Sequence, residues 1–203
     1  MASRTAVHEH GDGHARFVLL SAECSTSVSR YPLQSQAPNR NYHNRSCYEP
    51  LYGTIRQLES RVVIGDIGSH TMDPHRTLDG CLCYGSSVAV AAGAAAAAPE
   101  KRVICVTGDG GFSHSGRAGL AEALDRKVTL VVFVIDNGGC QDTGGQFVSV
   151  DWPDAGPGLR VEKWPLSNDC PLPLDRLQSW FEPGGVTLVR TEAPAQLASL
   201  PVP

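Results

Sequence analysis

Two apolar runs separated by a helical pattern constrain the fold of this chain more than any other feature. Residues 103–107 and 128–135 are continuous apolar runs, rich in β-branched residues and closed by Gly- and Asp-containing turns, as buried strands are. Between them, residues 113–126 carry apolar residues at helical spacing with charges between them. A strand–helix–strand unit of this kind is almost always right-handed and belongs to a parallel sheet. The sequence therefore predicts an α/β protein with three α/β/α layers around a mainly parallel sheet.

Each of the two predicted strands ends in a turn that carries a polar oxygen ligand. The first run leads into GDGG, at 108–111, and the second into DNGG, at 136–139. Ligands of open α/β sheets sit at the carboxyl ends of the strands, so we expect Asp109 and Asn137 to lie side by side. A carboxylate and an amide oxygen suit a hard cation such as Mg²⁺, which completes its octahedron with phosphate oxygens and water. The alternative is an α/β protein in which these two side chains only cap helices.

The glycines of the first turn add an anion-binding element to the same site. Gly110 and Gly111 would leave backbone N–H groups bare at the start of a helix, where a diphosphate binds well. A second GDG, at 11–13, follows no predicted strand and is interpreted as a plain turn. The place of the motif directly after a strand, and not the tripeptide alone, therefore carries the prediction.

The remaining elements are predicted from shorter patterns on either side of this unit. Residues 1–44 lack periodicity beyond a candidate strand at 17–20 and form an unassigned arm. Residues 45–192 form the predicted domain, and the Pro-rich residues 193–203 form a tail. Within the domain we expect, in chain order, an amphipathic helix at 45–58, a strand at 61–64, a Gly-rich loop at 65–70, an Ala-rich helix at 88–98, a surface loop at 153–158, a helix at 173–181 and a last strand at 185–191.

Length and charge exclude several classes of protein. The chain has 203 residues, of which 41% are hydrophobic, so it can bury one sizeable core. Its net charge is −4 and it has no basic stripe, which argues against a nucleic-acid partner. No run reaches the about 18 apolar residues of a membrane span, and the first residues lack an apolar signal core. We therefore expect a cytoplasmic protein with no membrane partner.

The cysteine pattern argues against metal centres built from sulfur. The chain has seven cysteines and no Cys-x-x-Cys pair, which disfavours a zinc site or a ferredoxin-type cluster bound by this chain. Cys105 lies in an apolar strand and is expected to be inert core. Cys81 and Cys83 are too close together for an ordinary ligand pair and are interpreted as reduced structural thiols.

Several motifs in sequence order resemble one family of cofactor-binding domains. The stretches GDIGSHTMDPHRTLDGCLCYGSSVAVAAG at 65–93, GDGGFSHSG at 108–116 and the later DN and TGGQ are similar to the thiamine-diphosphate-binding domain of indolepyruvate ferredoxin oxidoreductase and other 2-oxoacid oxidoreductases. DNGGCQDTGGQ, at 136–146, is equally similar to phosphonopyruvate and sulfopyruvate decarboxylases. The resemblance covers about residues 45–150. The chain departs from the oxidoreductase family in lacking its cluster-binding domain.

The resemblance implies a cofactor, a metal and the residues that hold them. Thiamine diphosphate would bind through Mg²⁺, held by Asp109, Asn137 and the backbone carbonyl of Gly139. Tyr84 and Gly85 would approach the aminopyrimidine ring, while Ser87 stands where decarboxylases place a bulky residue that props the bent cofactor. The full set of cofactor-binding positions implied is Gly68, Ser69, Tyr84, Gly85, Ser86, Gly108, Asp109, Gly110, Gly111, Asn137 and Gly139.

Two histidines stand next to these predicted loops. His70 follows the first Gly-rich loop and His114 follows the GDGGF turn, and a histidine can shuttle protons near neutral pH. We therefore take both as candidate catalytic residues, with helix N-terminal packing as the alternative for His114. Cys140 and Gln141 are weaker candidates for the substrate pocket.

Three functions remain open at this point. The first is the cofactor-binding subunit of a two-chain thiamine-diphosphate-dependent 2-oxoacid decarboxylase or carboligase, which the missing Cys-x-x-Cys favours. The second is a subunit of a ferredoxin-linked 2-oxoacid oxidoreductase, and the third is a noncatalytic α/β module that binds Mg²⁺ and phosphate. The family implies a glutamate, on a separate pyrimidine-binding domain, that activates the cofactor. We therefore expect a hetero-oligomer in which a partner chain supplies this glutamate and the substrate is a small 2-oxo acid.

Overall fold

The structure is a computed structural model that describes residues 48–71, 73, 75–140, 146–182 and 184–193. The expected arm at 1–44, with its candidate strand at 17–20, lies outside the described residues, and so does all of the tail except Ala193. The predicted domain boundaries therefore stay predictions. In the part of the chain that is described, no helix combines the length and the apolar character needed to cross a bilayer.

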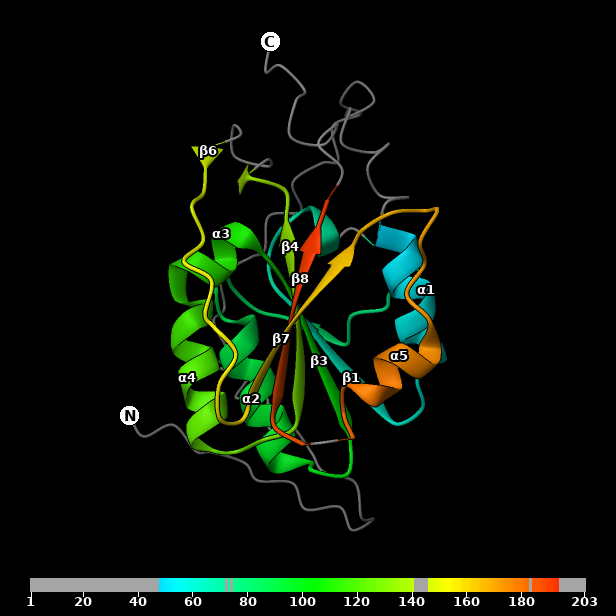
Figure 1. The fold of residues 1–203 in the computed structure, drawn as a ribbon, viewed down its shortest axis with the longest axis vertical. Helices are drawn as coiled ribbons and strands as arrows, with labels where there is room; N and C mark the ends of the chain where they lie inside the picture. Colours follow the sequence, from blue (N-terminus) through cyan, green and yellow to red (C-terminus); the bar gives the residue numbers. More distant parts are fainter. Residues whose placement is uncertain (1–47, 72, 74, 141–145, 183, 194–203) are drawn as a thin grey trace, which may run out of the picture. The chain divides into compact units, whose positions relative to one another are not determined.

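A six-stranded sheet, parallel throughout, forms the middle layer of the described residues (Figure 1). Its strand order is β2-β1-β3-β4-β8-β7, so that β8, the last strand of the described residues, lies between β4 and β7. Because all strands run in one direction, their carboxyl ends share one edge of the sheet. The strands are β1 (Arg61–Gly65), β2 (Gly80–Cys81), β3 (Arg102–Gly108), β4 (Leu130–Asp136), β7 (Leu159–Pro165) and β8 (Val186–Glu192).

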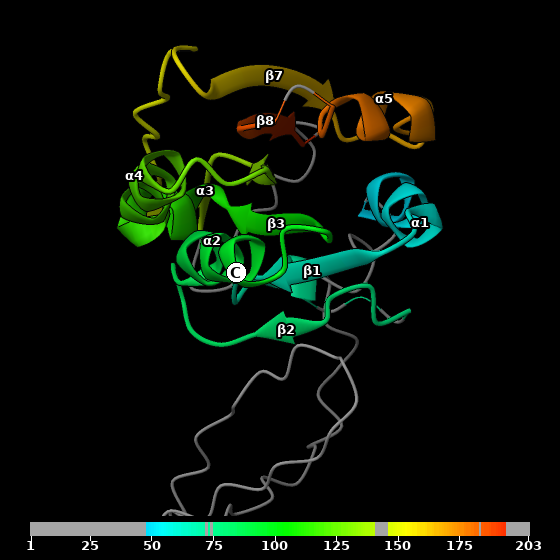
Figure 2. The same cartoon turned by 90° about the horizontal axis from the view of Figure 1, so that it is seen from below.

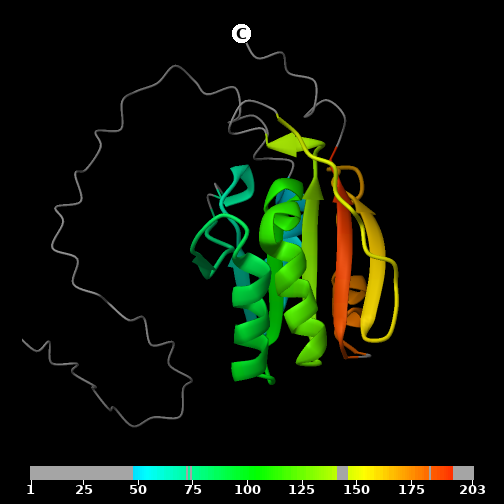
Figure 3. The same ribbon diagram turned by 90° about the vertical axis from the view of Figure 1, so that its left-hand side faces the viewer.

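Helices cover both faces of this sheet, which confirms the three-layer α/β/α prediction. One face carries α2 (Ser87–Ala97) and α4 (Arg117–Asp125), which lie side by side (Figure 3). The other carries α1 (Glu49–Gln57) and α5 (Leu174–Ser179), seen on the opposite side of the strands in Figure 2.

The two faces are packed with different kinds of side chain. The α2 and α4 face is mostly aliphatic, with one stacked aromatic pair, Phe112 and Trp152. A Cβ on Gly119 would lie 2.5 Å from the Ala89 backbone nitrogen, so only glycine allows this helix contact. The α1 and α5 face is aromatic, with Tyr52 and Trp180 almost fully buried. The small residues of the Ala-rich helix suggest close packing against a sheet or another subunit, and the structure packs α2 against the sheet and against α4.

Most predicted elements appear within a few residues of their expected positions, with four additions. The helix expected at 45–58 is described from Glu49, and Leu51, Ile55 and Leu58 on its apolar face are buried. The helix expected at 113–126 instead starts at the GDGG turn, as α3 (Asp109–Gly111), and passes through a π-helical turn, η3 (Phe112–Gly116), into α4. The sequence reading did not foresee β2, β7, the 3₁₀ turn η2 (Ser69–Thr71) or the antiparallel pair β5 (Gly139–Cys140) and β6 (Gln146–Phe147).

Candidate functional site

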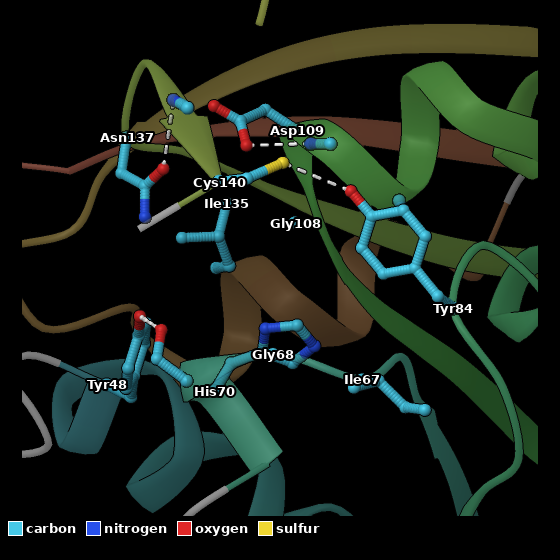
Figure 4. Close-up of a pocket in the computed structure, with 14 residues that line it drawn as sticks. Tyr48, Ile67, Gly68, His70, Tyr84, Gly108, Asp109, Ile135, Asn137 and Cys140 are labelled. Carbon is cyan, nitrogen blue, oxygen red and sulfur yellow. Dashed lines mark hydrogen bonds between the residues drawn. The ribbon is translucent and has the colours of Figure 1, made fainter. Parts of the chain in front are cut away.

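A cavity of about 470 Å³ lies at the carboxyl edge of the sheet (Figure 4). It is enclosed by the loops that follow β1, β3 and β4, together with one side chain from the start of α1 and one from the loop before α2. Most of the predicted cofactor-binding residues line it. The residues that line the cavity are Tyr48, Ile67, Gly68, Ser69, His70, Tyr84, Gly108, Asp109, Gly110, Gly111, Ile135, Asn137, Gly139 and Cys140.

Asp109 presents an incompletely satisfied carboxylate to this cavity. It is the first residue of α3, directly after β3, and only 2% of its surface is exposed. Its Oδ1 accepts a hydrogen bond from the backbone N–H of Gly110 at 2.7 Å, whereas Oδ2 is buried with no hydrogen-bond partner among the described residues. Burial raises the pKa of this carboxyl above its ordinary value, and the nearby Asp136 adds to the shift. A cation bound at Oδ2 would remove this cost.

Asn137 lies at the same end of the cavity as Asp109 (Figure 4), and Gly139 also lines the cavity. The Asn137 Oδ1 is only weakly engaged, by the backbone N–H of Gly139 at 3.4 Å. A Cβ on Gly139 would collide with the carbonyl oxygen of Gln146 in β6, so the β5–β6 pair requires glycine here. One orphaned carboxylate oxygen, one amide oxygen and a nearby backbone carbonyl are the donors a Mg²⁺ ion takes, so the residues present fit the implied metal.

The GDGG turn approaches its neighbours too closely for any side chain. A Cβ on Gly110 would meet the Tyr84 hydroxyl and lie 2.5 Å from the Cys140 Sγ. A Cβ on Gly111 would lie 2.5 Å from Oδ2 of Asp66. These glycines therefore bring bare backbone to the wall of the cavity at the start of the helical segment, as the predicted diphosphate site requires. The π-helical turn that follows is a feature frequent at functional sites.

His70 lines the cavity as a neutral imidazole. Only 3% of its surface is exposed, and burial lowers its pKa from 6.5 to about 4. The negative charge of Asp66 and a hydrogen bond to the Asp66 backbone oppose this shift only in part. Its Nε2 is buried with no hydrogen-bond partner among the described residues, so one ring nitrogen remains open to a ligand. A proton-relay role for His70 would therefore start from the uncharged ring.

Helix α1 supports the loop that carries His70. The Tyr52 hydroxyl donates a buried hydrogen bond of 2.7 Å to the backbone carbonyl of His70. The Tyr48 hydroxyl and the Ser69 Oγ are also 2.7 Å apart, at the wall of the cavity. Ser69 and His70 were predicted from the sequence, but Tyr48 and Tyr52 were not. Their spacing of one helical turn places both on one face of the helix and could have indicated a shared role.

The Tyr84 side chain closes another part of the cavity wall. Its hydroxyl lies 3.2 Å from the Cys140 Sγ, and burial, followed by this hydrogen bond, raises the pKa of the phenol. His114 contacts Tyr84 edge-on, with ring centroids 5.4 Å apart, and its Nδ1 lies 3.1 Å from the Ser115 Oγ. His114 is exposed and does not line the cavity, so its catalytic role stays a prediction.

Gly85, Ser86 and Ser87 stand behind the cavity wall rather than on it. The Gly85 carbonyl accepts a hydrogen bond of 2.9 Å from the Ser115 Oγ, and the Ser86 Oγ donates to the Cys83 carbonyl at 2.8 Å. Ser87 is fully buried, and its hydroxyl donates to Asp66. Cofactor contacts by these three residues stay predictions. Gln141 and residues 142–145 lie outside the described residues.

A family model matches the segment that contributes all but one of the residues lining this cavity. Residues 66–161 match the family described as "Thiamine pyrophosphate enzyme, C-terminal TPP binding domain". Thiamine pyrophosphate is the cofactor also called thiamine diphosphate, and the matched segment includes Asp109 and Asn137 but not α1, β1 or β8.

Known proteins similar to this chain include both oxidoreductases and a decarboxylase. Indolepyruvate oxidoreductase subunit IorA of Methanothermobacter marburgensis is 36% identical over 110 residues, which are 49% of this chain and 18% of that protein. "Probable pyruvate decarboxylase Pdc101" of Schizosaccharomyces pombe is 31% identical over 86 residues, 42% of this chain and 14% of that protein. The chain thus spans less than a fifth of the length of these relatives.

A solved structure confirms the three-layer α/β/α fold. The 2-oxoglutarate:ferredoxin oxidoreductase from Magnetococcus marinus, with 2-oxoglutarate, coenzyme A and succinyl-CoA bound, superposes with a TM-score of 0.55. The similarity covers 77% of this chain and 62% of that chain at 18% identity. At this identity the likeness extends to the fold only.

Proposed function

We propose that this chain is the subunit of a two-chain thiamine-diphosphate-dependent enzyme that binds the cofactor's diphosphate and Mg²⁺ and acts on a 2-oxo acid. The observation that carries the proposal is the buried Oδ2 of Asp109, which has no hydrogen-bond partner among the described residues and belongs to a cavity that Asn137 and Gly139 also line. A noncatalytic Mg²⁺–phosphate module would use the same ligands, but the family match favours an enzyme.

The residues of the cavity divide the work of holding this cofactor. Asp109, Asn137 and the Gly139 carbonyl would hold Mg²⁺, which in turn would neutralise the diphosphate. The backbone of Gly110 and Gly111 would contact the phosphate oxygens. The cofactor, when bound, supplies the reactive carbon centre and accepts the electrons released from a 2-oxo acid. The chain itself would bind and orient the cofactor and would exclude water from the cavity.

Two features of the cavity support a separate partner chain. None of the described residues that line it is a glutamate, so the glutamate that activates the cofactor would come from another polypeptide. Four large apolar side chains of the described residues are exposed, and the cavity wall includes Ile67 and Tyr84, which are 50% and 40% exposed. Leu82 precedes Tyr84 by two residues, and Phe147 pairs with Gly139 across β5 and β6. A partner would cover this apolar rim.

The outcome of the reaction has two candidates. The IorA relatives favour a subunit of a 2-oxoacid oxidoreductase, which passes electrons to an acceptor. The Pdc101 match and the absence of Cys-x-x-Cys in the chain favour a decarboxylase or carboligase. We rank the oxidoreductase first, which reverses the order that the cysteine pattern alone suggests, because more of the matched relatives carry that name.

The test is to purify the full chain alone and together with the polypeptide that co-purifies with it. We expect the chain alone to convert 2-oxo acids far more slowly than the order of 1 s⁻¹ at the low end for enzymes, and the complex to be active. Turnover only with ferredoxin or a viologen supports the oxidoreductase, whereas release of CO₂ without an acceptor supports the decarboxylase. Rapid turnover by the chain alone would refute the two-chain proposal.

A further inference from the structure

Asp66 is a second buried carboxylate, and the proposed cofactor chemistry does not use it. Its side chain is fully buried behind the cavity wall, and the described residues contain no ion pair to it. It is surrounded instead by hydrogen-bond donors. The donors are the backbone N–H of Ile67 at 2.8 Å, the backbone N–H of Gly85 at 2.8 and 2.9 Å to the two oxygens, the Thr107 Oγ1 at 3.0 Å and the Ser87 Oγ at 3.2 Å.

These donors come from three segments that lie far apart in the sequence. Ile67 follows β1, Gly85 and Ser87 belong to the entry into α2, and Thr107 lies near the end of β3. The carboxylate therefore ties together three loops at the carboxyl edge of the sheet. It also lies against the GDGG turn, since a Cβ on Gly111 would come within 2.5 Å of its Oδ2.

The Gly85 bond connects Asp66 to the part of the cavity wall that Tyr84 forms. Gly85 has φ +80°, a conformation that glycine adopts without strain, and its neighbour Tyr84 lines the cavity opposite Gly110. The position of Tyr84 therefore depends on where the Gly85 backbone is held. Asp66 and the Ser115 Oγ hold that backbone from its N–H and its carbonyl, respectively.

We propose that Asp66 is a positioning residue: it fixes the Tyr84–Gly85 segment against the GDGG turn and so sets the shape of the cofactor cavity. The step from cavity shape to cofactor affinity rests on the proposed function; the step from Asp66 to the loop does not. A carboxylate suits this place because it only accepts hydrogen bonds. An amide would turn an NH₂ group toward these donors, and the backbone N–H groups of Gly85 and Ile67, unlike the two hydroxyls, cannot become acceptors.

Asp66→Asn tests the proposal, with Asp79→Asn as the matched control. Asp79→Asn removes the same charge near the same strand. Asp79, however, is exposed and accepts one hydrogen bond, from the Val63 N–H at 2.8 Å. In Asp66→Asn we expect amide hydrogen exchange at Gly85 to accelerate at least about tenfold, with the amides of β4 unchanged, because charge-assisted bonds to a buried N–H are lost. Thiamine diphosphate with Mg²⁺, measured by calorimetry, should bind at least about tenfold more weakly, whereas Asp79→Asn should alter neither quantity by more than about twofold.

Thr107→Val is the second variant, for the case in which Asp66→Asn does not fold. It is nearly isosteric and removes one donor while keeping the charge, so we expect exchange at Gly85 to accelerate only about threefold. Unchanged exchange at Gly85 in both variants would overturn the proposal, and so would equal acceleration at Gly85 and throughout β4, which indicates general destabilisation. Faster exchange at Gly85 with unaltered cofactor affinity would refute the link to the cavity. If the wild-type chain binds no thiamine diphosphate, the proposed function fails, while the exchange data still decide what Asp66 holds.

Discussion

Asp66 and Asp109 occupy equivalent places in the sequence but differ in how many hydrogen bonds their carboxylate oxygens accept. Each follows a glycine at the end of a buried parallel strand, and each is at most 2% exposed. Every oxygen of Asp66 accepts hydrogen bonds, whereas Asp109 has one oxygen without a partner among the described residues. Both oxygens of Asp66 are satisfied without a ligand, whereas one oxygen of Asp109 is not.

The register of the sheet explains this difference. β1 ends at Gly65, which pairs with Val106, while β3 continues to Gly108. Asp66 therefore still lies beside a strand, where Thr107 can reach it, and the Asp66 N–H donates to the Val106 carbonyl at 2.9 Å. Asp109 emerges past the end of β3 and borders the cavity. Burial alone thus does not distinguish a structural carboxylate from a binding carboxylate; the number of donors each oxygen meets does.

The largest effect that separates the two carboxylates is on metal and cofactor binding. We expect Asp109→Ala and Asn137→Ala each to weaken Mg²⁺-dependent binding of thiamine diphosphate at least about 100-fold, because each removes a hard oxygen ligand from a shared ion. Calorimetry measures the affinity, and thermal unfolding checks that the domain stays folded. The exposed Asp154→Ala is the control. Wild-type affinity in either site variant would contradict the assignment of the metal ligands.

The next largest effect is a pH dependence centred on His70, the histidine beside Asp66. Its pKa in the folded state is about 4, below the ordinary 6.5, so the unfolded chain binds the proton first as pH falls. The contribution of His70 to the free energy of unfolding is complete above about pH 6.5 and is lost as pH falls to about 4, by roughly 3 kcal/mol at most. Urea unfolding of wild type and His70→Gln across this range measures the contribution. Parallel pH profiles for the two proteins would show the prediction to be wrong.

A smaller effect tests the support that α1 gives to the same loop. Tyr52→Phe should lower the free energy of unfolding by about 1–2 kcal/mol, because it leaves the buried His70 carbonyl without its donor. Tyr48→Phe should cost less, about 0.5 kcal/mol, since its partner Ser69 is only half-buried and can turn toward water. Chemical denaturation compares the two variants. A larger loss in Tyr48→Phe than in Tyr52→Phe would reverse this account of the loop.

The smallest effect has opposite signs at the two carboxylates. Without metal, Asp109→Asn should raise the free energy of unfolding at pH 7 by about 1 kcal/mol or less, because it removes a buried charge with an unpartnered oxygen. The same change at Asp66 should lower it. The raised pKa of Asp109 means that the folded state binds its proton more readily, so the advantage of Asp109→Asn should shrink as pH falls through that pKa. An advantage that grows on acidification would exclude an ionised Asp109 in the metal-free protein.

The sequence was most informative where local pattern decides the outcome. The runs at 103–107 and 128–135 became β3 and β4, and parallel pairing then brought Asp109 and Asn137 to one cavity as predicted. The Ala-rich helix likewise formed α2, from Ser87 to Ala97. In each case the residues that fix the structure lie within the segment itself.

The features that were missed depend on partners elsewhere in the chain. Strand β7 is an edge strand in which Arg160, Glu162 and Lys163 interrupt the apolar pattern, so its alternation is weak without knowledge of β8. The role of Asp66 follows from the stagger between β1 and β3, which no local pattern reports. No sequence pattern indicates the π-helical turn either, because the apolar spacing of 113–126 fits an ordinary helix equally well.

The position of β8 inside the sheet has a consequence for biosynthesis. β7 leaves the ribosome before β8, yet its only sheet neighbour in the described structure is β8, and β4 keeps an open edge until β8 arrives. The nascent sheet therefore cannot be completed until the chain has been translated past Glu192. A transcript truncated before Val186 would release a protein with an unpaired, apolar strand edge at β4, a template for aggregation. Completion of the described sheet thus depends on β8, although the segment that matches the cofactor-binding family is synthesised well before it.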